Sequence, residues 1–169
     1  MRLLGAVMIV SAMSMIGILK YAEYKRCCTV LREITAMLEL MKSEICTYHA
    51  PMNRVLDRIY SGFEDAIKDF AKALIASLDS LGDREFTTLW SDAVSDALYL
   101  IPTDCIEELK LLGTSIGRYN AGIQGEALDR CEAFFIKKHD EWQLQLKAMG
   151  KTYIGLYSGA GLIAAIAMI

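Results

Sequence analysis

Residues 24–48 read YKRCCTVLREITAMLELMKSEICTY and carry the periodicity from which the rest of the chain can be interpreted. Their apolar positions alternate between steps of three and four: Cys27, Leu31, Ile34, Leu38, Met41, Ile45 and Tyr48. That spacing places all of them on one face of an α-helix. The helix must end before Pro51, because a residue that precedes proline is disfavoured in helical geometry. We therefore expect one long helix with a buried stripe.

Helical spacing recurs along the whole chain, and no stretch alternates with period two, which predicts an all-α fold. Pro51 suits the first turn of a short helix that Gly62 ends. Further helices are expected over Phe63–Leu81, after a cap at Asp83, and after a cap at Thr103.

The last helix is expected to start near Gln124 and to carry a similar apolar stripe. We expect it to pair antiparallel with the first helix as a long stalk, with Leu38 and Phe135 in the seam. Three or four shorter helices would then pack against one end of this stalk.

Two runs without any charged residue, Leu3–Leu19 and Tyr153–Ile169, bound the chain. Each is 17 residues long, or about 26 Å as a helix, which is near the short limit for a bilayer core of about 30 Å. The runs predict transmembrane helices at 1–19 and 153–169 that form a hairpin anchor, with a cytoplasmic helical-bundle domain of about six helices at 20–152. A cleaved signal peptide is the alternative for the first run, and a buried core helix for the second.

The orientation and the redox state follow from basic residues and cysteines. Lysines and arginines concentrate on the domain side of both runs, which predicts a cytoplasmic domain with both termini outside. The five cysteines have no CxxC spacing, which is typical of reduced core thiols.

Gly155 and Gly159 form a GxxxG pattern, which favours close packing of one helix on another. The expected partner is the first run, with Gly5 and Gly17. The alternative is that the pattern occurs by chance.

The composition argues against several kinds of chemistry. The 18 basic and 21 acidic residues give no basic excess for binding nucleic acid. His49 and His139 have no cysteine at the spacing of metal ligands, and no catalytic arrangement of Ser, His and Asp can be proposed. We therefore expect no metal, no cofactor, no small-molecule substrate and no enzymatic activity. A membrane enzyme is the alternative, and it would require a polar cluster that the sequence does not indicate.

The segment 117–124 is the candidate partner-binding loop. It carries Gly117, Arg118, Tyr119, Asn120 and Gln124, a mixture of flexible, planar and hydrogen-bonding residues that is typical of interface anchors. The alternative is an ordinary connection between helices with a solvated arginine.

Several short motifs, in order along the whole chain, resemble the stage III sporulation protein AB family. They are Leu3-Leu4-Gly5-Ala6 with Gly17, Leu31-Arg32, Glu44-Ile45, Pro51, Leu112-Gly113, Ile116-Gly117 with Gln124, and Tyr153-Ile154-Gly155. The chain departs from the family at Asn120, where the family usually has an aspartate.

The resemblance implies a protein of the mother-cell membrane around the forespore, with a domain similar to the cytoplasmic domains of type II secretion platform proteins. It also implies partners: a hexameric secretion-type ATPase, stage III sporulation protein AA, and other channel components. The expected function is a non-enzymatic membrane platform that couples this ATPase to the channel. The alternative is a membrane-tethered helical receptor or passive tether for a soluble regulator.

Overall fold

The computed structural model describes the backbone of residues 2–78, 84–116 and 121–167, and the side chains of residue 11 and of 15–78, 84–116 and 121–148. Within these ranges the chain is all-α, with six α-helices, one π-helical turn and no β-strand. The elements are α1 (Arg2–Lys42), η1 (Ser43–Thr47), α2 (Met52–Gly62), α3 (Asp65–Ser77), α4 (Phe86–Ala97), α5 (Thr103–Ser115) and α6 (Ala121–Ala167). The predicted all-α fold is confirmed.

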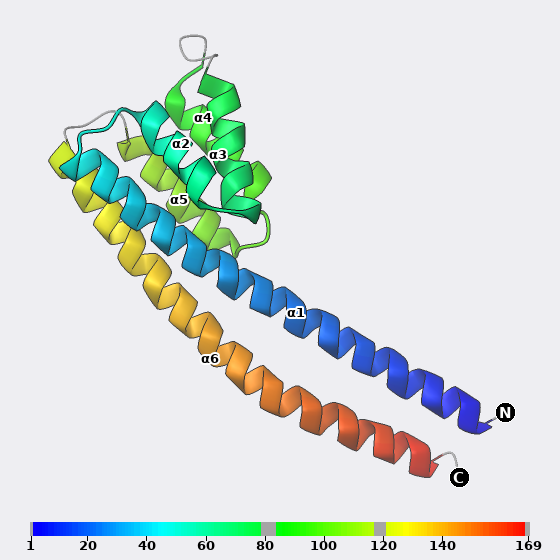
Figure 1. Cartoon of the computed structure of the whole chain (residues 1–169). Coiled ribbons are helices and arrows are strands. Elements are labelled where there is room, and N and C mark those ends of the chain that lie inside the picture. The colour runs from blue at the N-terminus through cyan, green and yellow to red at the C-terminus, as the bar shows by residue number, and fades with distance from the viewer. Residues whose placement is uncertain (1, 79–83, 117–120, 168–169) are drawn as a thin grey trace. The chain divides into compact units, whose positions relative to one another are not determined.

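The chain divides into two compact units. One consists of Met1–Cys28 with Asp140–Ile169, and therefore of the outer parts of α1 and α6. The other, Thr29–His139, is a bundle that contains the remainder of both long helices and the four short helices α2–α5 (Figure 1).

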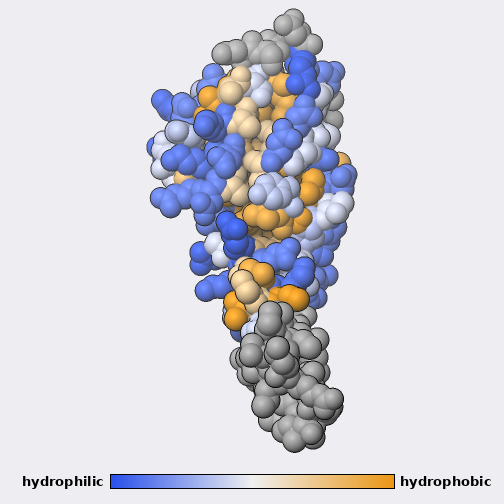
Figure 2. Space-filling view, turned by 90° about the vertical axis from the view of Figure 1, so that its right-hand side faces the viewer, coloured by the Kyte–Doolittle hydropathy of each residue, from blue (hydrophilic) through white to orange (hydrophobic). Residues whose placement is uncertain are grey.

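The core of the bundle is formed by the stripe that the sequence predicts. Leu31, Ile34, Leu38 and Met41 on α1 are fully buried, and so is Phe135 on α6. Each short helix packs against the next one along the chain, α2 on α3, α3 on α4 and α4 on α5. Figure 2 shows one face of the molecule, on which hydrophilic side chains border a narrow apolar strip of the bundle. Most of the periodic apolar side chains are thus buried in the interior.

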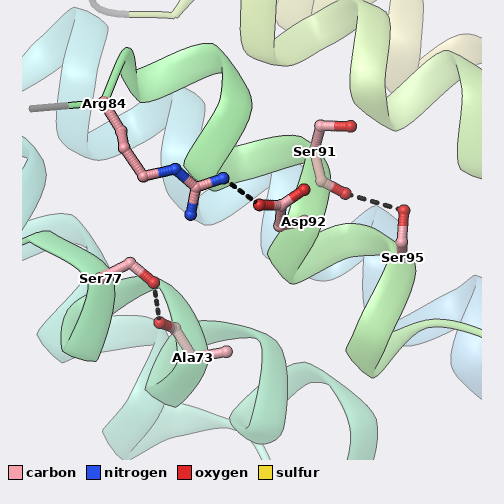
Figure 3. Close-up of polar contacts among 6 residues, drawn as sticks. All are labelled: Ala73, Ser77, Arg84, Ser91, Asp92 and Ser95. Carbon is pink, nitrogen blue, oxygen red and sulfur yellow. Dashed lines mark hydrogen bonds and ion pairs between the residues drawn. The ribbon is translucent and has the colours of Figure 1, made fainter. Parts of the chain in front are cut away.

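Local hydrogen bonds define the helices on either side of residues 79–83. Ser77 Oγ donates to the Ala73 carbonyl at 2.7 Å near the end of α3 (Figure 3). Arg84 pairs with Asp92 of α4, Nη2 to Oδ2 at 2.5 Å (Figure 3). Helix α4 begins after Glu85. The predicted cap at Asp83 lies outside the described residues.

Helix α5 begins one residue earlier than its predicted cap would require. Pro102 holds the cap position with φ −56° and ψ 149°, and Thr103 is the first helical residue. No side chain caps this end. The expected Thr103 cap was therefore wrong, because Pro102 is already fixed in the extended geometry that precedes a helix.

In the unit of paired outer helices, α1 and α6 meet through aromatic rings. The ring centroids of Tyr24 and Trp142 lie 4.8 Å apart at an interplanar angle of 30°. Met15, Ile16, Ile18 and Leu19 are all exposed, at 57–68 % of their maximal surface. Gly17 is half-buried, whereas the surroundings of Gly5, Gly155 and Gly159 lie outside the described side chains.

Among the described residues, no helix combines the length and the apolar character required to cross a bilayer. The predicted transmembrane hairpin at 1–19 and 153–169 was therefore wrong. Each uncharged run has only 17 residues, the lower limit for a spanning helix, and charged sequence adjoins it. Helix α1 then continues without a break into the charged sequence that begins at Lys20.

Candidate partner-binding site where α1 ends and α6 begins

Most of the predicted partner-binding loop cannot be placed. Gly117, Arg118, Tyr119 and Asn120 lie outside the described residues. Gln124 is half-buried in the first turn of α6, which begins at Ala121, so it belongs to a helix and not to the loop. The structure does describe the segments before and after the loop, and a turn that contacts the start of α6.

That turn is η1, where α1 changes from α-helical to π-helical geometry. The Tyr48 amide donates to the Ser43 carbonyl at 3.3 Å, and the Ala50 amide donates to the Glu44 carbonyl at 2.9 Å. His49 then adopts φ 50°, which a non-glycine residue rarely occupies. π-Turns and strained residues are frequent at functional sites. The end of α1 is therefore a candidate site on backbone geometry alone.

A thiol and a glycine hold η1 against the start of α6. Cys46 Sγ donates to the Ala121 carbonyl at 3.4 Å. Next to it, a Cβ built on Gly125 would lie 3.0 Å from the same sulfur, which is tighter than ordinary packing. Directly before η1, Lys42 forms an ion pair with Asp129 of α6. These contacts hold the start of α6, directly after residues 117–120, against η1. We call residues 43–50 together with 121–125 the η1 site (Figure 1).

A buried carboxylate ties α2 to the same turn. Glu44 is only 3 % exposed, and its Oε1 lies 3.2 Å from Arg58 Nη1 of α2. A buried carboxylate without a partner would cost several kcal/mol, so this ion pair is what permits Glu44 to lie there. Sequence reasoning missed Glu44 as a structural residue. The signal was available, because position 44 adjoins Ile45 and lies three residues after Met41 on the apolar stripe.

Large side chains at the η1 site remain exposed. Tyr48 is 68 % exposed and Ile123 is 45 % exposed. His49 and Arg54, on either side of Pro51, are exposed as well. Tyrosine and arginine are the residues that most often anchor protein interfaces. The η1 site and the adjoining start of α2 can therefore offer aromatic, aliphatic and cationic contacts within a short length of chain.

The cysteines are arranged for packing and not for nucleophilic chemistry. All five are free, and all except the half-buried Cys46 are buried, as expected of core residues. Burial, with smaller contributions from Cys28 and Glu23, raises the pKa of Cys27 to about 12. Burial, together with Glu108, likewise raises the pKa of Cys131 to about 12. Thiols with such pKa values are poor nucleophiles at neutral pH.

The described residues contain no group of three or more His, Cys, Asp or Glu side chains that could hold a metal ion. Several carboxylates near the bundle surface form ion pairs with lysines or arginines. Lys138 Nζ of α6 lies 2.5 Å from Asp104 Oδ2 at the start of α5. This pair lowers the pKa of Asp104, chiefly through the hydrogen bond from Lys138.

Taken together, the described helices define an all-α helical-bundle protein. Comparison with known families then places it within that class: the family model for stage III sporulation protein AB matches residues 2–169. The chain belongs to the stage III sporulation protein AB family and therefore has a role in sporulation. The family is not known as a family of enzymes. Neither the curated proteins nor the solved structures contain a match.

Proposed function

We propose that the protein is a non-enzymatic platform of a channel-like or secretion-like assembly between mother cell and forespore. In this role it couples a cytoplasmic secretion-type ATPase, stage III sporulation protein AA, to other components of the assembly. The family match over residues 2–169 is the observation that carries the proposal. The η1 site supports it, because exposed anchor residues are held there on a fixed turn next to the predicted loop.

The direct test is copurification of the full chain with the candidate ATPase. We expect a complex that survives washing, and we expect Arg118→Glu combined with Tyr119→Ala to weaken it while the bundle stays folded. Lys137→Glu is the matched charge control, because Lys137 is exposed on α6 at about 24 Å along the helix from Ala121, at about 1.5 Å per residue. Failure of the unmodified chain to bind the ATPase under any condition would remove the platform function.

A double variant that stays folded and binds normally would have a different meaning. It would leave the platform function in place and move the contact surface away from residues 117–120, toward the short helix after Pro51. We also propose that the protein acts at the mother-cell membrane around the forespore with the bundle in the cytoplasm. Fractionation of sporulating cells tests this location, and recovery of the chain in the forespore fraction alone would contradict it.

A further inference from the structure

Two arginines share the side of α2 that is turned toward η1. Arg54 and Arg58 are four residues apart, so they lie one above the other on the helix. The ion pair between Arg58 and Glu44, at 3.2 Å, shows which way this side faces. The side chain of Arg58 is nevertheless 61 % exposed, and Arg54 is exposed too. Both guanidinium groups therefore keep N–H donors open to solvent. We call Arg54 and Arg58 the arginine pair.

The segment before the arginine pair supplies no exposed acidic side chain that could neutralise it. Glu44 is the one acidic residue in the segment 43–53, and it is buried beneath Arg58. Asp57 is exposed on α2 and points about 100° away from Arg58 around the helix, but it lies three residues after Arg54 and is a neighbour of that arginine on the helix surface. The chain as a whole is acidic, with a net charge of −3, so this cationic surface is a local exception.

An exposed aromatic side chain lies close to the arginine pair in the sequence. Tyr48 directly follows η1 and is 68 % exposed. It is separated from α2 by only three residues, His49, Ala50 and Pro51. An arginine presents paired N–H donors that match the two oxygens of a carboxylate, and an exposed tyrosine ring offers area at low entropic cost. The combination fits a ligand that carries several carboxylates and an aliphatic side chain.

We propose that the arginine pair and Tyr48 form a docking surface for an acidic segment of a partner protein. Carboxylates of that segment bind Arg54 and the open donors of Arg58, and an aliphatic side chain packs on Tyr48. This inference rests on the proposed function for its setting, since the segment would belong to a component of the sporulation assembly. It adds the chemistry of that component and the surface that receives it.

The test uses the full chain and a short fluorescein-labelled peptide of glutamate and leucine, followed by fluorescence anisotropy. We expect this peptide to bind at low salt and to weaken as salt rises. Peptides with glutamine or lysine in place of glutamate should bind more weakly. Arg54→Glu should weaken binding by about tenfold or more, the effect of one lost charged hydrogen bond. Lys137→Glu makes the same charge change on α6 and should have a much smaller effect.

Arg58 requires a paired variant, because its removal alone would leave Glu44 buried without a partner. Glu44→Met with Arg58→Met replaces both by apolar side chains of similar length and should also weaken binding. Equal loss in Arg54→Glu and Lys137→Glu, no binding of the acidic peptide, or binding of the glutamine peptide to the same extent would each overturn the inference. None of these results would affect copurification with the ATPase, so the platform function is judged separately.

Discussion

Trp90 of α4 lies directly against Gly113 of α5, and the two residues leave no room for a Cβ between them. A Cβ built on Gly113 would come within 2.6 Å of Trp90 Cγ and 2.8 Å of its Nε1. The same indole Nε1 donates a hydrogen bond of 2.7 Å to the Leu109 carbonyl, one turn earlier on α5. The ring of Phe70 meets Trp90 edge-on, with the centroids 5.1 Å apart. Gly113 is thus what lets α3, α4 and α5 close around one side chain.

Gly113→Ala should therefore destabilise the bundle, although alanine is the better helix former. Overpacking in a filled core costs about 1–3 kcal/mol, which exceeds the gain of up to about 1 kcal/mol in helix propensity. Chemical denaturation followed by tryptophan fluorescence measures the difference. Gly62→Ala is the matched control, because nothing lies within 4 Å of a Cβ at that position. Equal midpoints for the two variants would show that Trp90 can move aside at little cost.

The ion pair between Glu44 and Arg58 gives a second prediction. Arg58→Ala leaves a carboxylate that is 3 % exposed without its partner and should cost about 1–3 kcal/mol. The value stays below that of a fully buried pair, because the arginine itself is largely exposed. The double variant Glu44→Met with Arg58→Met should recover most of the loss. If Arg58→Ala unfolds at the same midpoint as the unmodified chain, Glu44 does not depend on this partner.

Acidic residues around the start of α3 give the stability of the bundle a pH dependence. Burial, and then repulsion from Asp65 and Glu64, raises the pKa of Glu33 despite the opposing charge of Arg32. A raised folded-state pKa means that this stability contribution is complete below the unfolded pKa and is lost as pH rises through the folded one. Glu33→Gln should therefore raise the melting temperature at neutral pH and have less effect at acidic pH. An equal effect at both pH values would indicate a cause other than titration.

Asp104 should show the opposite sign. The hydrogen bond from Lys138 lowers its pKa, so its contribution is present above the ordinary aspartate pKa and is lost as pH falls through the folded value. Asp104→Asn should lower stability at neutral pH and lose this effect at strongly acidic pH. Thermal melts across the acidic range measure the change in melting temperature for Asp104→Asn and for Glu33→Gln. A neutral Asp104→Asn at pH 7 would mean that solvent screens the half-exposed pair completely.

Cys46 should be the first cysteine to react with a thiol reagent in the folded protein. It is half-buried, whereas the other four are buried, and burial raises the pKa of Cys27, Cys28 and Cys131. Mass spectrometry after brief treatment should find one rapid modification, which Cys46→Ser removes. Rapid labelling of two or more cysteines in the unmodified chain would contradict this order. Cys46 is also the residue to use as a reporter for the predicted cytoplasmic orientation.

The helices could be predicted from sequence because their apolar stripes are regular. Six of the seven stripe positions between Cys27 and Tyr48 are buried as the spacing requires. Tyr48 is the exception: η1 interrupts the α-helical register just before it, and the side chain turns outward. A hydrophobic pattern does not predict a π-turn, because the turn depends on a few backbone hydrogen bonds. The expected helix from Phe63 begins two residues later, at Asp65, within the usual uncertainty of helix ends. It ends at Ser77, whereas its predicted end at Leu81 lies outside the described residues.

The candidate site was only partly within reach of sequence reasoning. The glycines and planar side chains of 117–124 predict a contact surface before α6, and this stays a prediction, whereas the hydrogen bond from Cys46 to Ala121 joins residues 75 positions apart. No local pattern encodes such a contact. The transmembrane prediction failed for a different reason: it rested on uncharged runs at the lower limit of length, and among the described residues no helix is long and apolar enough to cross a bilayer.

The π-turn at residues 43–47 also has a genetic consequence. A π-turn contains about one residue more than an α-helical turn. Loss of a single codon within η1 would therefore leave an ordinary α-helical turn and keep the residues beyond it in phase. The same loss in the α-helical part of α1 would rotate all that follows by about 100°. The contacts that depend on the extra residue are those made from the turn itself, between Glu44 and Arg58 and between Cys46 and Ala121.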